Sequence, residues 1–222
     1  MASIVTYKYI KQNPDIMEYI RRADKALEAL GYTEHSFAHV ERTAQVTSMV
    51  LEELGYDERT VELAKIASIM HDIGNVINRA DHAQSGAVMA FRLLDNLSMP
   101  ASEICSIISA IGNHDESTGI PASAVSAALI LADKADVRRS RVRDKDFSYS
   151  DIHDRVNYAV KTSELKLDIK NKQAILKLTV DTGVAPVMEY FEIFLARMIM
   201  CKNAAAYLGL EFKLVMNETK VL

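Results

Sequence analysis

Side chains that can bind metal ions end two of the most apolar runs of this chain. Residues 66–72 read Ile-Ala-Ser-Ile-Met-His-Asp, and residues 127–133 read Ala-Ala-Leu-Ile-Leu-Ala-Asp. A carboxylate beside such a core is strongly disfavoured unless it is paired or binds a metal. Further histidines lie before, between and after these runs. A fold of this chain must therefore gather scattered imidazole and carboxylate groups in one buried place, which predicts a metal site. The candidate ligands are His39, His71, Asp72, His82, His114 and Asp133.

The composition is that of an ordinary globular protein. Of 222 residues, 49% are hydrophobic and 25% charged, which suits one large domain or a domain with an appendage. The net charge of −4 offers no general attraction for nucleic acid or an anionic membrane, so we expect neither as a partner. Two cysteines without CxxC spacing suggest buried free thiols. The chain starts without a signal-peptide pattern, and its apolar runs are too short to span a membrane, so we predict a cytoplasmic protein.

The first three quarters of the chain carry the periodicity of helices. Apolar residues recur at helical spacing from Ile16 to Leu30, after the start signal Asn13-Pro14, and Gly31 ends this helix. The same reasoning predicts helices over about 36–54, 58–73, 83–97, 101–113, 122–140 and 150–163. We therefore predict a mainly α protein with a helical bundle over residues 1–163.

The pattern changes at about residue 164. Apolar residues alternate with polar ones over 165–169 and 174–180, with Asn171-Lys172 as a turn, and this indicates a β-hairpin. A helix over about 186–208 and a strand over 210–216 follow. We predict that residues 164–222 form a small α+β appendage, a three-stranded antiparallel sheet with one helix. It would pack on the bundle or form a homodimer contact.

The order of the candidate ligands resembles the HD superfamily of metal-dependent phosphohydrolases. The resemblance covers roughly residues 35–140 and is carried by Phe-Ala-His-Val-Glu-Arg (37–42), Met-His-Asp-Ile-Gly (70–74) and Leu-Ala-Asp-Lys-Ala-Asp (131–136). It implies a helical bundle in which His39, His71, Asp72 and Asp133 hold one ion. His82 and His114 fall where the dinuclear branches of the superfamily place ligands of a second ion, and Asp72 would bridge both ions.

Imidazole and carboxylate ligands suit Fe, Mn, Co, Ni or Zn, so we expect two divalent transition metal ions as cofactors. Two ions against two carboxylates would leave a positive site that attracts a phosphoryl group and activates a bridging hydroxide. The predicted activity is hydrolysis of a phosphate ester or anhydride of a small, nucleotide-like molecule, with Asp72 as the catalytic carboxylate.

Candidate phosphate ligands lie near these residues in the sequence. Arg42 is three residues beyond His39, on the same helix face, with a structural ion pair as the alternative. Lys134 adjoins Asp133, and Arg138 follows closely. Asp136 either orients a ligand or is a helix surface charge. Arg138 also begins a basic cluster that reads as a solvated helical face or as a phosphate-steering patch; its other members are Arg139, Arg141, Arg143 and Lys145.

Other activities stay open. His114-Asp115-Glu116 followed by Gly119-Ile120-Pro121 only partly matches the cyclic-dinucleotide phosphodiesterases of the superfamily, in which a second His and a Tyr stand at 115 and 120. The ligand order is closer to small bacterial members that hydrolyse nucleotides or dinucleoside polyphosphates. It is also the order that holds a mixed-valent di-iron centre in inositol oxygenase. A non-catalytic interaction domain is the third alternative, and it predicts no bound metal.

Overall fold

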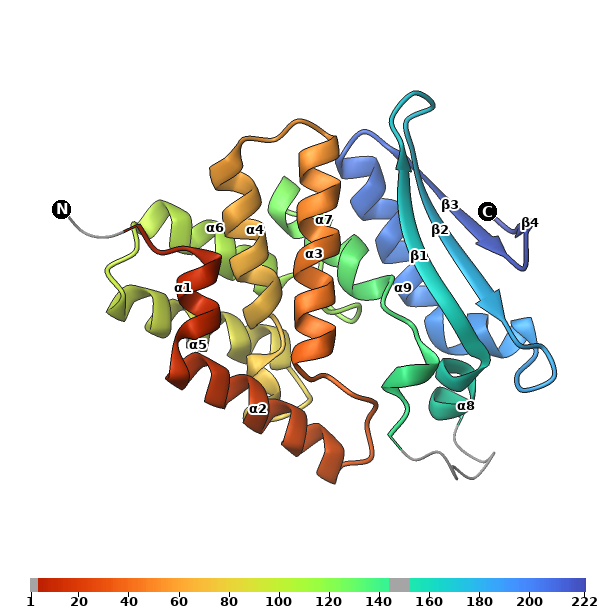
Figure 1. The fold of residues 1–222 in the computed structure, drawn as a ribbon, viewed down its shortest axis with the longest axis horizontal. Coiled ribbons are helices and arrows are strands. Elements are labelled where there is room, and N and C mark those ends of the chain that lie inside the picture. The colour runs from red at the N-terminus through yellow and green to blue at the C-terminus, as the bar shows by residue number, and fades with distance from the viewer. Residues whose placement is uncertain (1–3, 144–151) are drawn as a thin grey trace.

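The computed structural model describes residues 4–143 and 152–222, which form a helical bundle with a sheet at one end (Figure 1). The α-helices are α1 (Tyr7–Gln12), α2 (Pro14–Ala29), α3 (Phe37–Glu53), α4 (Glu58–Met70), α5 (His82–Asn96), α6 (Ala101–Gly112), α7 (Ala124–Lys134), α8 (Ile152–Ala159) and α9 (Val187–Tyr207). Two short 3-10 helices are η1 (Ile73–Val76) and η2 (Arg139–Arg141). The predicted mainly helical class is confirmed.

Local sequence signals set where the helices begin and end. The Asn13 side chain accepts hydrogen bonds from the first turn of α2, and Ser36 and Asp57 cap α3 and α4 in the same way. Gly31 and Gly55 follow α2 and α3 with φ of 79° and 77°, the left-handed conformation that glycine adopts without strain. These boundaries match the predicted ones within a few residues.

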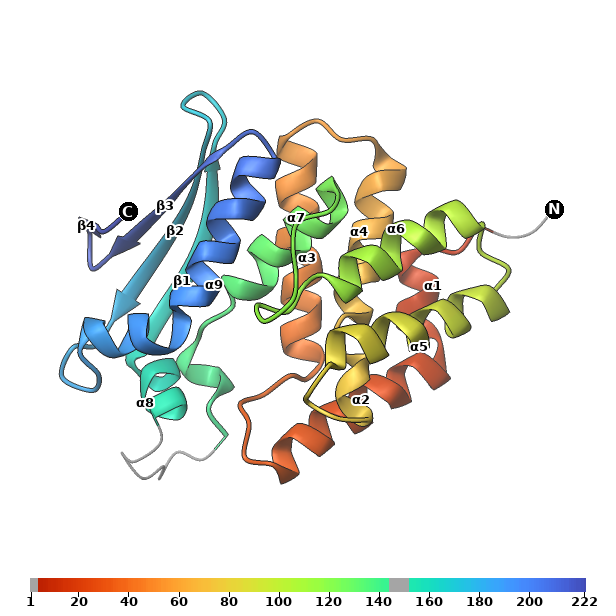
Figure 2. The same cartoon turned by 180° about the vertical axis from the view of Figure 1, so that it is seen from behind.

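Helix α7 lies at the centre of the molecule, between the other bundle helices and α9 (Figure 2). Its residues from Val125 to Ala132 are all buried, which explains why this run is apolar without helical periodicity. It contacts α3, which carries His39, and α4, which leads into His71 and Asp72. This packing brings Asp133 next to residues 39, 71 and 72.

The helix predicted over 122–140 ends earlier, at Lys134. The chain then turns so that Asp136 becomes 2% exposed, and the guanidinium of Arg141 donates to the Asp136 carbonyl oxygen at 2.7 Å. The arginines after Asp136 therefore do not share a solvated helical face. Each instead pairs with an acid: Arg138 and Arg141 with Asp136, Arg139 with Asp181, and Arg143 with Asp24. Lys145 lies outside the described residues.

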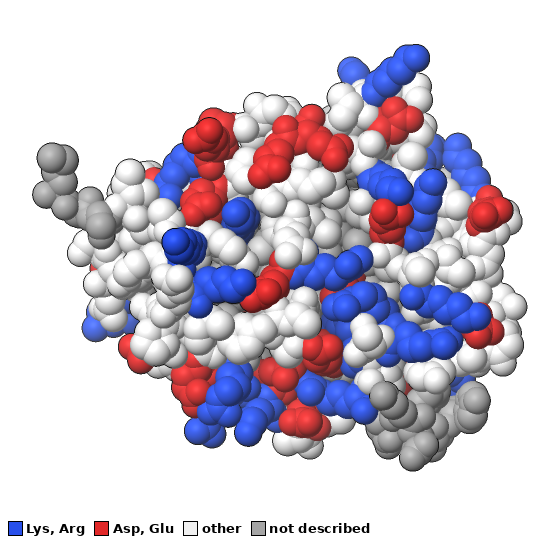
Figure 3. Space-filling view, in the orientation of Figure 1, with Lys and Arg blue, Asp and Glu red and all other residues white. Residues whose placement is uncertain are grey.

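Lysine and arginine side chains gather on the surface between α3 and the sheet, right of centre in Figure 3. Basic residues of α3, of strand β1 (Val160–Asp168) and of the segment between α7 and β1 form ion pairs: Arg42 and Arg138 with Asp136, and Arg139 and Lys161 with Asp181. Arg139 of η2 thus pairs with an acid that follows the second strand of the sheet.

The sheet contains β1 (Val160–Asp168), β2 (Gln173–Val180), β3 (Glu211–Met216) and β4 (Thr219–Lys220), in that spatial order. The hairpin β1–β2 is antiparallel as predicted, but β3 pairs parallel with β2, so the prediction of a purely antiparallel sheet was wrong. The reason is that α9 carries the chain back along the sheet, and β3 therefore runs in the direction of β2. The short strand β4 was not predicted.

The apolar core runs without interruption from the bundle into the sheet, and it includes Leu131 of α7, Phe194 of α9 and Leu214 of β3. The domain boundary at residues 163 and 164 stays a prediction, and β1 already begins at Val160. Both cysteines are free; Cys201 is buried as expected, whereas Cys105 is exposed. Across residues 4–143 and 152–222, every helix is too short or too polar to span a lipid bilayer.

Candidate metal centre

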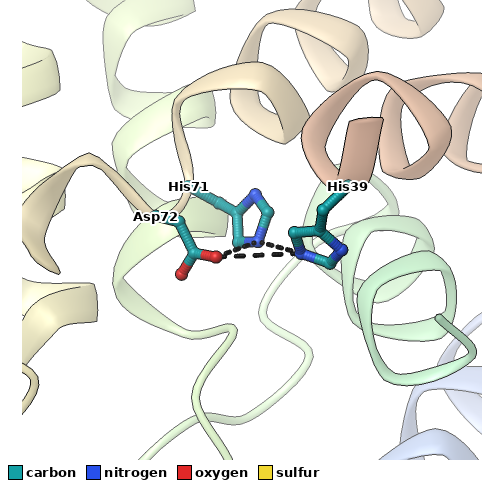
Figure 4. Close-up of side chains that lie close together, drawn as sticks. All are labelled: His39, His71 and Asp72. Atoms are coloured by element: carbon teal, nitrogen blue, oxygen red, sulfur yellow. Dashed lines mark hydrogen bonds and ion pairs between the residues drawn. The ribbon is translucent and has the colours of Figure 1, made fainter. Parts of the chain in front are cut away.

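Three buried side chains converge where α3 meets the end of α4 (Figure 4). His39 comes from the first turn of α3, and His71 and Asp72 follow the last residue of α4. The Nε2 atoms of His39 and His71 lie 3.3 Å apart. Asp72 Oδ2 lies 3.3 Å from His71 Nε2 and 3.7 Å from His39 Nε2. Three donor atoms thus surround one point.

Asp133, at the end of α7, adds a fourth donor to this group. Its Oδ1 lies 3.3 Å from His39 Nε2 and 3.6 Å from His71 Nε2. The side chain comes from a third helix, which the sequence separates widely from the other two. The group formed by His39, His71, Asp72 Oδ2 and Asp133 Oδ1 is called the first donor group below.

A second pair of histidines faces the other oxygen of Asp72. His82 begins α5, and His114 follows the end of α6. Their Nε2 atoms lie 3.2 Å apart, and Asp72 Oδ1 lies 3.5 Å from His82 Nε2 and 3.7 Å from His114 Nε2. This second donor group therefore consists of His82, His114 and Asp72 Oδ1. Both histidines are at most 2% exposed.

The Nδ1 atoms of all four histidines face hydrogen-bond acceptors of the protein. A proton on Nδ1 leaves the Nε2 lone pair free, which is how histidines are held for metal binding. With their protons on Nδ1, the Nε2 atoms of His82 and His114, 3.2 Å apart, have no proton between them and cannot hydrogen-bond to one another. The acceptors are Asp136 Oδ2 for His39 (2.8 Å), the Ser68 carbonyl for His71 (2.7 Å), the Arg79 carbonyl for His82 (3.1 Å) and the Ile111 carbonyl for His114 (2.6 Å).

The two donor groups fit divalent transition metals. Asp72 Oδ2 is buried and has no hydrogen-bond partner among the described residues, although a buried carboxylate oxygen is costly without one. A tetrahedral ion with ligands at about 2.1 Å holds its donors roughly 3.4 Å apart. The donors here are 3.2–3.7 Å apart. An ion in the first donor group would give Asp72 Oδ2 its partner.

The carboxylates and imidazoles of the site shift one another's protonation. Burial would raise the pKa of Asp72, but His71 and His114 hold it well below the usual range. For His71, burial would lower the pKa, yet the nearby carboxylates Asp72 and Asp133 raise it to about 10. Burial lowers the pKa of His82 to about 4. In the absence of metal, the first donor group therefore keeps a proton on His71 that an incoming cation must displace.

The three predicted phosphate ligands lie around the first donor group without contacting its centre. Arg42 Nε lies 3.1 Å from Asp136 Oδ1, and Arg138 Nε lies 2.5 Å from the same oxygen. Among the described residues, neither guanidinium contacts a metal donor. Lys134 Nζ lies 2.8 Å from Asp133 Oδ2. The structure thus brings the six predicted metal ligands together, and a phosphate-binding role for Arg42, Lys134 and Arg138 stays a prediction.

Asp136 is buried and orients His39 through the 2.8 Å contact with Nδ1, so of its two alternatives the structure shows the orienting one. Burial would raise its pKa, but hydrogen bonding to His39 and the charge of Arg141 keep it well below the usual range. A charged carboxylate behind a ligand imidazole increases the basicity of the ring.

Three basic residues beside the donors, His35, Arg79 and Arg197, were not predicted from the sequence, and Arg141 was predicted only as a member of the basic cluster. His35, Arg79, Arg141 and Arg197 line the same small space as the donors of both groups. The ring centroids of His35 and His39 lie 5.6 Å apart. In the sequence, His35 lies four residues before His39 and Arg79 lies three residues before His82, and these spacings could have indicated that they lie near the site. Arg197 gave no signal, because it lies in the appendage, far along the chain from every ligand.

A bundle of helices that converges on buried histidines and aspartates defines a metal-binding α protein. The model of the HD domain family matches residues 36–155, more than half of the chain, and the chain belongs to this family. A search of functionally curated proteins gave no match. Among solved structures, a predicted HD superfamily hydrolase from an uncultured Thermotogales bacterium is similar at 25% identity, covering 59% of this chain and 73% of its own, with a TM-score of 0.45.

Proposed function

We propose that this protein is a metal-dependent phosphohydrolase with two divalent ions, and that Asp72 bridges them. The observation that carries the proposal is the position of the Asp72 carboxylate, whose Oδ2 faces His39 and His71 while its Oδ1 faces His82 and His114. One carboxylate between two separate histidine pairs is the arrangement that a dinuclear site requires. The fully formed donor set also supports an enzyme over a non-catalytic domain.

Bound divalent ions would supply an activated hydroxide at neutral pH and neutralise the phosphoryl oxygens. The protein's own groups would position the reactants. Asp72 and Asp133 contribute two negative charges, so the loaded site keeps a positive excess for a phosphate. His35 lines the site and binds the Thr33 carbonyl through Nδ1 at 2.7 Å, which leaves its Nε2 as a hydrogen-bond acceptor. It would hold the attacking water by one of its protons.

Lys134 would complete the phosphate environment from the side of α7. Its Nζ lies 2.8 Å from Asp133 Oδ2 and 2.7 Å from Glu116 Oε2, so the ammonium group is fixed at the edge of the first donor group. Burial would lower its pKa, but Asp133 and Glu116 raise it, and the side chain stays charged. A small phosphate ester or anhydride could then bind between Lys134 and the ions.

The test replaces one bridging or terminal ligand at a time. In His71→Ala and Asp72→Ala we expect loss of metal, measured by elemental analysis after loading with Mn²⁺. We also expect loss of phosphate release from a panel of nucleotides and general phosphodiesters, with an unchanged circular dichroism spectrum. Asp95→Ala, an exposed position of α5, is the control and should behave as the wild type. Unchanged metal content in Asp72→Ala would refute the ligand assignment.

The same purified protein also distinguishes hydrolysis from the alternative, oxygen activation by a di-iron centre. A di-iron oxygenase would show a mixed-valent electron paramagnetic resonance signal and oxygen uptake, without phosphate release from any substrate of the panel. That result would overturn the proposed hydrolysis while leaving the donor set in place.

A further inference from the structure

A cavity of about 450 Å³ adjoins the metal centre, and three arginines from distant parts of the chain line it. Arg79 precedes α5, Arg141 belongs to η2, and Arg197 comes from α9. The same three arginines and His35 also line the space that holds the metal donors. The cavity is therefore continuous with the metal centre, and its volume lies in the range of small-molecule sites.

Each arginine is held by one part of its guanidinium group. Arg141 donates from Nε to the Glu34 carbonyl at 2.9 Å and from Nη1 to the Asp136 carbonyl at 2.7 Å. Arg197 Nε lies 2.9 Å from Glu116 Oε1, and Arg79 Nη1 donates to Asn75 Oδ1 at 3.3 Å. Within residues 4–143 and 152–222, none of the three donates a hydrogen bond from Nη2. A guanidinium group that is fixed through some of its N–H groups, and keeps others free, is preorganised to bind an oxyanion.

The charges around the cavity favour an anion. Its acidic wall residues are Glu116 and Asp154, against three arginines. Glu116 is shared between Arg197 and Lys134, whose Nζ lies 2.7 Å from Glu116 Oε2. Arg141 is 4% exposed, and its acidic partner Asp136 lies 3.9 Å away and is shared with Arg42 and Arg138, so the Arg141 guanidinium gains from an additional anionic partner. The cavity thus carries an excess of positive charge beyond what its own acids offset.

We propose that Arg79, Arg141 and Arg197 form a subsite for a second anionic group of the substrate, separate from the phosphoryl group that is cleaved. The preferred substrates are therefore phosphate compounds with a further phosphate or carboxylate, and compounds with a single phosphate bind less well. Helix α9 would make the appendage part of the active site, because it supplies Arg197. This inference rests on the proposed function, in which the metal centre binds the cleaved group.

The alternative role of Arg197 is purely structural, an ion pair that fastens α9 to Glu116. A structural role predicts that loss of Arg197 lowers stability without changing which ligands bind. A subsite predicts a change in the preference between ligands with one and two anionic groups. Binding measurements with matched probes separate the two.

The probes are straight-chain alkane-bisphosphonates with two to six methylene groups and alkyl monophosphonates of the same lengths. Their affinities for the Mn²⁺-loaded protein are measured by titration calorimetry, so hydrolysis is not needed. We expect one bisphosphonate length to bind at least about tenfold more tightly than its monophosphonate, the gain typical of one charge-assisted contact. This advantage should fall to within about threefold in Arg197→Gln, with unchanged monophosphonate affinity.

Two further variants make the result decisive. Arg197→Lys keeps the charge without the planar fork and should retain part of the advantage. Arg92→Gln, at an exposed position of α5, is the control and should retain all of it. If Arg197→Gln does not fold, Arg79→Gln on the partly exposed turn before α5 serves the same test.

Equal affinities of both probe series for the wild type would overturn the subsite. An advantage that persists in Arg197→Gln and Arg79→Gln would do so as well. Failure of the proposed function gives a different result. In that case the affinity of the monophosphonates would not depend on Mn²⁺, because the metal centre would not bind their phosphonate group.

Discussion

Replacing Gly74 with alanine should pull the second histidine pair away from Asp72. Gly74 lies in η1, two residues after Asp72, where the backbone of α5 approaches closely. A Cβ atom at this position would lie 2.0 Å from the His82 carbonyl oxygen and 2.5 Å from the Gly86 nitrogen. Both are backbone atoms, so no side-chain rotation relieves the contact, and α5 must move.

The size of the effect follows from these distances. An ordinary contact of a Cβ atom with oxygen is longer than about 3 Å, so the His82 carbonyl must shift by roughly 1 Å. His82 Nε2 lies 3.5 Å from Asp72 Oδ1, and coordination bonds of about 2.1 Å do not tolerate such a shift. We expect at least about 100-fold weaker binding of the second ion and a loss of about 1–3 kcal/mol in the free energy of unfolding. The first donor group should keep its ion.

Titration calorimetry with Mn²⁺ and urea denaturation of the metal-free protein measure both effects. Gly112→Ala is the matched control, because its Cβ would meet only the Ala87 Cβ at 3.6 Å, an ordinary contact. Gly86→Ala, with contacts of 3.2 and 3.3 Å, should lie between the two. If Gly74→Ala binds two ions with wild-type affinity, the close approach of η1 and α5 does not position the second group, and the reasoning is wrong.

Three more predictions follow from the site and the core. Asp136→Asn should weaken binding of the first ion by about 10- to 100-fold in calorimetry, because His39 loses its charged acceptor; equal weakening at both sites would contradict this. The pKa of about 10 keeps His71 protonated at pH 7.5, so metal uptake at this pH should release a proton. Calorimetry in buffers of different ionisation enthalpy measures this release, and binding enthalpies that do not vary with the buffer would disprove it. Leu214→Ala, at a fully buried position of β3, should lower the free energy of unfolding by about 2–5 kcal/mol in urea, with one transition; a second transition would show that the sheet unfolds by itself.

The helices and the metal donors could be predicted because their signals are local. Caps such as Asn13 and Ser36, and glycines such as Gly31, act within one turn of the residues they terminate. Apolar runs that end in His71-Asp72 and Asp133 mark carboxylates that need a partner, wherever the chain places them. The short helix α1 and the strand β4 were missed, because segments of a few residues carry too little periodicity.

Tertiary packing decided the features that depend on residues far apart in the sequence. Asp136 looked equally suited to the surface, and it is buried behind His39 because α7 ends at Lys134 and the chain turns inward. The direction of β3 depends on how far α9 carries the chain along the sheet, which no pattern within the strand records. Arg197 reaches the metal centre only because α9 packs on α7.

The sequence alone indicated which buried groups need a partner, since the cost of a bare buried carboxylate is a property of the residue and its neighbours along the chain. How the other five candidate ligands divide between the two oxygens of Asp72, and which arginines surround the adjoining cavity, depends on the packing of the helices. Those relations are distances between separate helices, and they arise when the helices pack.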